Sequence, residues 1–192
     1  MKLIVGLGNP EKQYAKTRHN LGFEVLDEYR RKKNLDEWQL ENKFKAEIIK
    51  VGPDLILVRP QTYMNNSGLS VRQLVDYFKV KPEDIIVVYD ELDLPFGKIK
   101  IRMGGAAAGH HGVESIMSSI GTDRFIRIRL GIGTPETQSA EHGGQHVDVN
   151  HFVLSSFNHN EKSHVKHMLK QVIHALDALL EEGLEVVQNQ YN

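Results

Sequence analysis

Cysteine is absent from this 192-residue chain, which excludes thiol nucleophiles, thiolate zinc sites and disulfide frameworks. Long apolar runs are also missing. The opening MKLIVGLGNP holds only a short one, less than a signal peptide or a membrane-spanning helix needs. Nor is there an excess of positive charge: the formal net charge is −1, so any binding to nucleic acid requires a local basic patch. We therefore expect a cytoplasmic protein that does not contact a membrane.

The composition is that of a globular protein, with 40% hydrophobic and 26% charged residues. Apolar runs typical of strands alternate with segments of helical periodicity. The runs cover residues 2–7, 46–51, 54–60, 84–95, 98–103 and 124–133. Helices are predicted from a cap at Asn20 to about Arg31, after a cap at Asn66 or Ser67, over 112–120, and from a capping box at Asn158 and Glu161 to Gly183.

Gly52-Pro53-Asp54 separates two of the apolar runs and predicts a hairpin, so part of the sheet is antiparallel. The sequence therefore predicts an α/β fold with one domain over residues 1–192, a three-layer sandwich in which a twisted mixed β-sheet is flanked by helices. Residues 134–149 are polar and aperiodic, which is typical either of a lid or binding segment or of a disordered insertion. Both interpretations stay open.

The segment Gly6-Leu7-Gly8-Asn9-Pro10 resembles the start of a dinucleotide-binding loop, but Glu11 stands where the third glycine would be and Pro10 lacks an amide proton. Asn9 instead places a carboxamide at the carboxyl end of a strand, where α/β sheets build their sites. Thr17-Arg18-His19-Asn20 then precedes a helix. A helix N-terminus lowers the pKa of a nearby histidine, so we expect a neutral His19 that can accept a proton.

Three further polar segments stand at element boundaries: QTYMNNSG at 61–68, YDELDLP at 89–95 and GGAAAGHHG at 104–112. The acidic segment could bind a divalent metal, form a turn without function, or supply Asp90 to orient a histidine. The Gly/Ala segment lets a ligand approach the backbone, and the free amides at the start of the next helix could receive an oxyanion.

Taken together and in order, these segments resemble bacterial peptidyl-tRNA hydrolase. The matching pieces are GLGNP with Tyr14, TRHN, QTYMNNSG, the strand ending DELDLP, the GHHG segment and RIRLGIG. The resemblance extends over essentially the whole chain. It implies an enzyme, a carboxylic ester hydrolase, that cleaves the ester of peptidyl-tRNA at the acceptor end and releases peptide and tRNA. It also implies a monomer that uses no cofactor and no metal.

The resemblance implies a role for individual residues as well. His19 would be the catalytic base, and Asp90 the carboxylate that orients it. Substrate and water would be held by Asn9, Tyr14, Met64, Asn65 and His111. The last of these stands where the family usually has an asparagine, and imidazole lacks the paired donor and acceptor of an amide. The tRNA would be held by Lys100, Arg102 and Arg129.

Ester hydrolysis needs an attacking oxygen, a base and stabilisation of the oxyanion. With no cysteine and no G-x-S-x-G elbow, a water molecule activated by His19 is the economical attacking group. Two rivals stay open. A metal-dependent hydrolase could use one of two histidine sets, although no H-E-x-x-H motif occurs: His142, His146 and His151, or His164, His167 and His174. A non-catalytic RNA-binding protein would keep the basic strands but need no His19–Asp90 pair.

Overall fold

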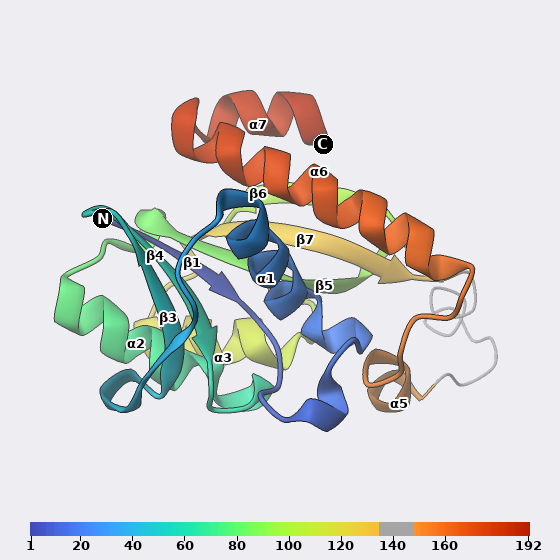
Figure 1. The fold of residues 1–192 in the computed structure, drawn as a ribbon, viewed down its shortest axis with the longest axis horizontal. Coiled ribbons are helices and arrows are strands. Elements are labelled where there is room, and N and C mark those ends of the chain that lie inside the picture. Colours follow the sequence, from blue (N-terminus) through green and yellow to red (C-terminus); the bar gives the residue numbers. More distant parts are fainter. Residues whose placement is uncertain (135–147) are drawn as a thin grey trace.

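The centre of the fold is a seven-stranded mixed β-sheet, seen in a computed structural model that describes residues 1–134 and 148–192 (Figure 1). The strand order is β2-β3-β4-β1-β5-β7-β6. The strands are β1 (Lys2–Gly6), β2 (Gln39–Glu41), β3 (Ala46–Val51), β4 (Leu55–Pro60), β5 (Ile85–Pro95), β6 (Ile99–Met103) and β7 (Ile126–Gly133). Strands β4, β1, β5 and β7 are parallel, while β2, β3 and β6 pair antiparallel with their neighbours. The predicted mixed sheet is confirmed.

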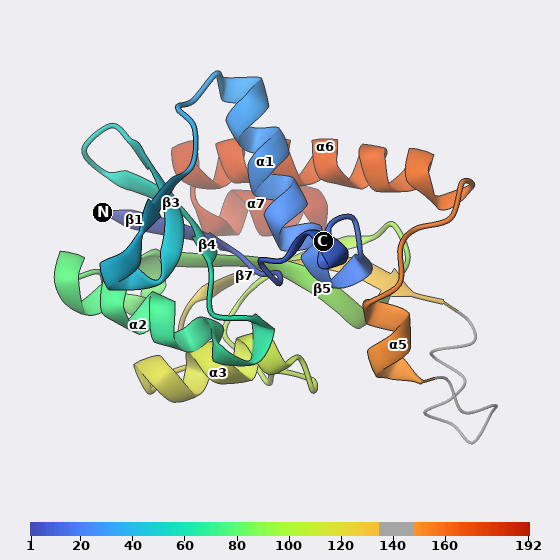
Figure 2. The ribbon, with the colours of Figure 1, turned by 60° about the horizontal axis from the view of Figure 1, so that its bottom comes forward.

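Helices cover both faces of this sheet, which gives the three layers that the sequence predicts (Figure 2). One face carries α1 (Leu21–Lys33), α6 (Glu161–Glu181) and α7 (Leu184–Tyr191), and the other carries α2 (Ser67–Phe78) and α3 (His111–Ile120). The short helix α5 (Val149–Val153) contacts the turn η2 (Arg18–Asn20). The described chain also contains short 3-10 helices of a single turn: η1 (Lys12–Tyr14), η2 (Arg18–Asn20), η3 (Asn42–Phe44), η4 (Met64–Asn66) and η5 (Pro82–Asp84).

The pleat of the central strand divides the core in two. In β5, Ile86 and Val88 pack under α1 and α6, whereas Ile85, Val87 and Tyr89 pack under α2 and α3. Successive side chains of a strand point to opposite faces, so a strand covered on both faces must be apolar throughout. The unbroken apolar run before Asp90 therefore follows from the central position of β5.

Close backbone packing brings the start of α1 against the ends of β1 and β5. A Cβ atom at Gly22 would lie 2.3 Å from the backbone nitrogen of Leu7 and 2.4 Å from the carbonyl oxygen of Val88. Backbone atoms at these distances cannot move aside, so only glycine fits there. The turn η2, which directly precedes α1, is thereby held at the carboxyl edge of the sheet.

Several local predictions are confirmed and some are wrong. The hairpin joins β3 to β4, with Gly52 at a φ of 63°. The box of Asn158 and Glu161 makes both of its reciprocal hydrogen bonds, at 2.7 and 3.0 Å. Capping of α1 by Asn20 is wrong, because the Asn20 carboxamide bonds the backbone of Asn9 instead. Capping of α2 by Asn66 or Ser67 is also wrong: Asn66 makes no side-chain cap bond, and the Ser67 hydroxyl donates backwards to the Met64 carbonyl.

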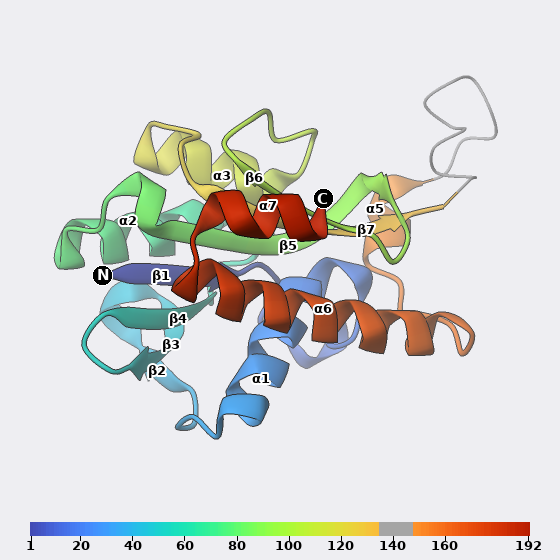
Figure 3. The ribbon, with the colours of Figure 1, turned by 90° about the horizontal axis from the view of Figure 1, so that it is seen from above.

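Two helices near the carboxyl end were not predicted from the sequence. Helix α5 begins inside the segment 134–149, of which residues 135–147 lie outside the described residues. Helix α7 follows Gly183 and lies against the edge strand β6 (Figure 3). There the Asn192 carboxamide accepts from the amide of Ile101 and donates to its carbonyl, at 2.7 and 2.9 Å. This contact satisfies the backbone groups of Ile101 in the edge strand, which would otherwise be open to pairing with another chain.

Candidate active site

A buried carboxylate at the end of β5 is the centre of the candidate site. Residues Ile85 to Glu91 are all buried, because β5 lies between β1 and β7 and is covered on both faces. Asp90 is only 2% exposed. An unpaired charge at this burial is costly, so the carboxylate requires hydrogen-bond donors.

His19 supplies the first donor. It lies in η2, and its Nδ1 is 3.0 and 2.9 Å from the two oxygens of Asp90. An ionised carboxylate only accepts hydrogen bonds, so Nδ1 carries the proton and the neutral ring keeps a lone pair on Nε2. That Nε2 makes no hydrogen bond within residues 1–134 and 148–192, and the side chain is 12% exposed. The geometry is that of a base held in one tautomer and open to a small molecule.

His110 supplies the second donor, which sequence reasoning missed. Its Nε2 lies 3.1 Å from Oδ1 of Asp90, and its ring centre is 5.0 Å from that of His19. The residue caps α3, where its Nδ1 accepts a hydrogen bond from the Val113 amide at 3.3 Å. Since Nδ1 accepts, Nε2 carries the proton and donates to Asp90. The sequence does contain a feature that could have identified His110: it stands directly before a helix, where an acceptor side chain can bond the first free backbone amides of that helix.

Charge in the cluster follows from this arrangement. Burial alone would raise the pKa of Asp90, but the charges and hydrogen bonds of His19 and His110 outweigh it and hold that pKa well below its ordinary value. For His19 the effects are reversed: burial alone would lower its pKa, but the Asp90 carboxylate raises that pKa above 6.5. The expectation that the helix N-terminus lowers the pKa of His19 is therefore wrong. A contacting carboxylate acts more strongly than the partial charge of a helix end.

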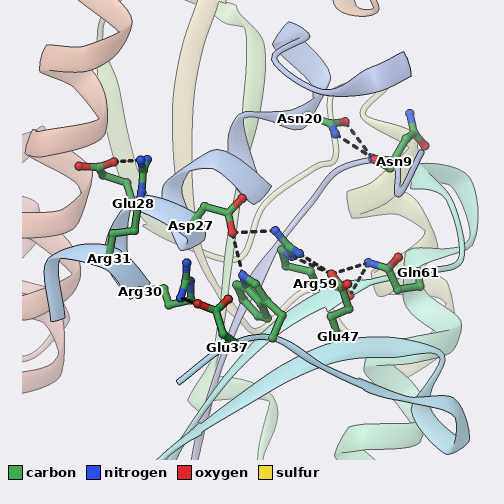
Figure 4. A network of polar contacts seen from close by, with 11 residues as sticks. Asn9, Asn20, Asp27, Glu28, Arg30, Arg31, Glu37, Glu47, Arg59 and Gln61 are labelled. Carbon is green, nitrogen blue, oxygen red and sulfur yellow. Dashed lines mark hydrogen bonds and ion pairs between the residues drawn. The ribbon is translucent and has the colours of Figure 1, made fainter. Parts of the chain in front are cut away.

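Asn9 lies beside this cluster and is held on three sides. Its Oδ1 accepts from the Met64 amide at 2.9 Å. The carboxamide of Asn20 bonds both the amide and the carbonyl of Asn9, each at 2.9 Å (Figure 4). The Nδ2 of Asn9 is left without a hydrogen bond to any described residue, although the residue is only 8% exposed. The site thus contains a fixed donor with spare capacity.

The other predicted substrate residues differ in how the structure holds them. Met64 is buried, and a Cβ at Gly112 would lie 2.4 Å from its Sδ, so the start of α3 packs directly on it. Asn65 follows in η4 and is exposed, while Tyr14 is half-buried in η1. Tyr63 directly precedes η4 and has a φ of 60°, and its hydroxyl donates to Glu11, which directly precedes η1. A bulky residue at positive φ is strained, and such strain concentrates at functional sites.

His111 points elsewhere. It is exposed, and its Nδ1 lies 3.3 Å from Glu114 on the next turn of α3. No hydrogen bond joins it to His19, Asp90 or Asn9 in the described part of the chain. Its role in holding substrate or water stays a prediction.

The predicted basic residues lie on neighbouring strands at one edge of the sheet. Lys100 and Arg102 of β6 stand opposite Arg129 and Arg127 of β7. Arg129 is bonded to the buried Glu91 at 2.8 Å. Arg127 is 2% exposed and donates to the carbonyls of Gly105 and Ala106, so it holds the Gly/Ala loop and does not face solvent. Arg102 is exposed and Lys100 is half-buried, and these two are the accessible cations of the set.

By spacing alone, the cluster could also hold a metal ion, because ligand atoms of His19, Asp90 and His110 lie within 4.8 Å of one another. The hydrogen bonding of His110 opposes this use. Ligation through Nε2 would move its proton to Nδ1, which would then face the Val113 amide donor. Of the two rival histidine sets, His142 and His146 lie outside the described residues. Within the described residues, neither set forms a cluster with metal-binding spacing.

A cavity of about 990 Å³ begins at Asn9 and Asn20 and extends along α1 to α6. Its wall includes Arg59, which bridges Asp27 at 2.7 Å and also pairs with Glu47 (Figure 4). Asn9 and Asn20 belong to the wall of this cavity, whereas His19, Asp90 and His110 do not line it. No helix within residues 1–134 and 148–192 combines the length and the apolar character that a membrane crossing requires.

Comparison with known proteins gives one consistent match. The family model described as peptidyl-tRNA hydrolase matches residues 3–192. The chain is 45% identical to a peptidyl-tRNA hydrolase of Aquifex aeolicus, over 94% of this chain and 91% of that protein. It is 43% identical over the full length of both chains to one of Bacillus cytotoxicus. The crystal structure of peptidyl-tRNA hydrolase from Acinetobacter baumannii superposes with a TM-score of 0.88 at 32% identity, covering 100% of this chain and 94% of that one.

Proposed function

This chain belongs to the peptidyl-tRNA hydrolase family and hydrolyses the ester bond of peptidyl-tRNA, and we propose that the attacking group is a water molecule activated by His19. One observation carries the mechanism: the contact of His19 Nδ1 with both oxygens of Asp90. It supports a base whose Nε2 lone pair is free for the proton of a water molecule. General bases of this kind contribute about 10²–10⁴-fold to a rate.

Asp90 acts on the reaction through His19. When His19 takes the proton of water, an imidazolium forms 2.9 Å from a buried carboxylate, whose charge stabilises it. His110 donates to the same carboxylate, so Asp90 is fixed from two directions and stays ionised. Such fixation keeps the orientation of His19 constant through the reaction.

Asn9 is the candidate for binding the reacting carbonyl. The Met64 amide and the Asn20 carboxamide fix its orientation, so its Nδ2 is a preorganised donor. Donors held in place before the reaction stabilise a developing oxyanion without reorganisation. Asn65 is exposed one residue beyond Met64, where it can contact the same substrate. The cavity that begins at Asn9 offers room for the peptide.

Binding of the tRNA part of the substrate requires positively charged side chains. Lys100 and Arg102 are the accessible ones at the β6 edge, and Arg129 is oriented by Glu91 beside them. They suit phosphate contacts, which position a nucleic acid without reading its sequence. With a net charge of −1 for the whole chain, the binding rests on this local patch. Action without a metal ion, as a monomer and in the cytoplasm is part of the same proposal.

Replacement of His19 tests the mechanism. His19→Ala is expected to lower kcat for N-acetylaminoacyl-tRNA by about 10²–10⁴-fold, while the Kd for the same tRNA stays within a factor of about two. His167→Ala, an exposed histidine of α6, is the matched control. Activity of His19→Ala equal to that of the control would exclude His19 as the base. Full activity in the presence of a chelator is expected, and its loss would favour the metal-dependent rival.

A further inference from the structure

Arg18, the neighbour of His19, is buried, and both of its Nη atoms donate hydrogen bonds, while its Nε has no partner among the described residues. Its Nη2 donates to both oxygens of Glu161 at 2.7 and 2.9 Å. Its Nη1 donates to the hydroxyl of Ser155 at 2.8 Å and to the carbonyl of Ser156 at 2.9 Å. The side chain is only 7% exposed. A single guanidinium thus joins η2 to the segment between α5 and α6.

The surrounding contacts bind the same two segments. The guanidinium carbon of Arg18 lies 4.5 Å from the ring centre of Phe152 and 4.8 Å from that of Phe157. In the backbone, the Arg18 amide donates to the Ser155 carbonyl at 3.1 Å, and Thr17 forms a β-bridge with Ser156. The segment 152–161 is therefore attached to η2 by side chain, ring and backbone.

The motif Thr17-Arg18-His19-Asn20 consequently contacts four separate parts of the chain. Thr17 bonds back to the Tyr14 carbonyl, Arg18 reaches 155–161, His19 reaches β5, and Asn20 holds Asn9. Two of these contacts belong to the reaction proposed above. The contact of Arg18 has no part in it, yet it fixes the backbone on which the base is mounted.

We propose that Arg18 is a positioning residue for ester hydrolysis: by clamping η2 onto Ser155, Ser156 and Glu161, it sets the place of His19 over Asp90. The inference rests on the proposed role of His19 as base. The η2 turn is a single turn whose position is not determined by its own hydrogen bonds, so outside contacts must determine it. A displacement of about 1 Å in a reacting group can cost on the order of 10²-fold in rate.

Arg18→Lys is the informative variant, because it keeps the positive charge and removes the planar fork that bonds Glu161 and the serines together. We expect kcat to fall by roughly 10–100-fold with KM within a factor of about three. Glu161→Gln is the milder second variant. Its amide oxygen can still accept from the Asn158 amide, so the capping box of α6 is kept. It should give a smaller loss in kcat of the same kind.

Lys33→Gln is the matched control. Lys33 pairs with Asp177 at 2.8 Å, which also joins the α1 region to α6 but at the far end of α1 from His19. It should lower the melting temperature slightly and leave kcat unchanged. All variants are compared after their folded fraction has been measured by near-UV circular dichroism.

The titration of His19, followed by NMR in the absence of substrate, separates positioning from plain stabilisation. The groups that face His19 are Asp90 from β5 and His110 from the start of α3. If Arg18→Lys loosens the contact with Asp90, the pKa of His19 should move back toward 6.5, whereas a purely structural role would leave it as in the wild type.

Loss of kcat together with this shift supports the proposal. Wild-type kcat in Arg18→Lys, or a wild-type titration of His19 in the folded variant, would overturn it. Failure of the proposed function itself would be recognised separately, as full activity of His19→Ala.

Discussion

Asp90→Asn should abolish most of the activity, and the reason lies in the two histidines that share this carboxylate. Asp90 accepts from Nδ1 of His19 and from Nε2 of His110, at 2.9 and 3.1 Å. A carboxamide replaces one of the two oxygens with a donating nitrogen. His110 contacts Oδ1, so the amide oxygen is best placed there, and the nitrogen then stands at the Oδ2 position, 2.9 Å from Nδ1 of His19, where a donor would face a donor. His110 is held in its tautomer by the Val113 amide. We therefore expect His19 to adapt, with its proton moved from Nδ1 to Nε2.

A His19 ring with its proton on Nε2 cannot take a proton from water. The expected loss in kcat is thus the full contribution of a general base, about 10²–10⁴-fold. At about 1.4 kcal/mol per factor of ten this corresponds to roughly 3–6 kcal/mol of activation free energy. If Asp90 did no more than orient His19, its replacement would have a milder effect. The difference arises entirely from the second histidine.

Single-turnover hydrolysis of N-acetylaminoacyl-tRNA measures this loss without interference from product release. Asp93→Asn is the matched control, because it makes the same chemical change at an exposed position of the same strand. The nitrogen chemical shifts of His19 report the tautomer directly. Retention of more than about a tenth of the wild-type kcat by folded Asp90→Asn would refute the tautomer argument.

Three further predictions follow from the same geometry. Because Asp90 raises the pKa of His19, the pH profile of kcat should have its acid limb centred above 6.5 and fall tenfold per pH unit below it; a midpoint below 6.5 would contradict the contact. Lys100→Gln and Arg102→Gln should each lower the slope of log affinity against log salt by about one, measured by fluorescence titration with tRNA. Gly22→Ala should destabilise the protein by about 1–3 kcal/mol in urea unfolding, because its Cβ would meet backbone 2.3 Å away.

Much of the fold was predictable because it depends on local patterns. The apolar run of β5 marks a strand covered on both faces, and the turn at Gly52 marks the β3–β4 hairpin. These features are determined by residues close together in the chain. Helix α7 was missed because its stability comes from packing on β6, which its own short sequence does not reveal.

For the site, the sequence by itself determined the positions of His19, Asp90 and Asn9, each at the boundary of a recognisable element, and the family to which the chain belongs. Only the tertiary structure decided that His110, and not His111, contacts Asp90. Only it showed that Asn20 holds Asn9 and that Arg18 reaches Glu161. His19 and Asp90 are 71 residues apart in the chain, and Arg18 and Glu161 are 143 apart. Which polar group partners which is decided when distant segments meet in a buried space, where every donor and acceptor must be satisfied.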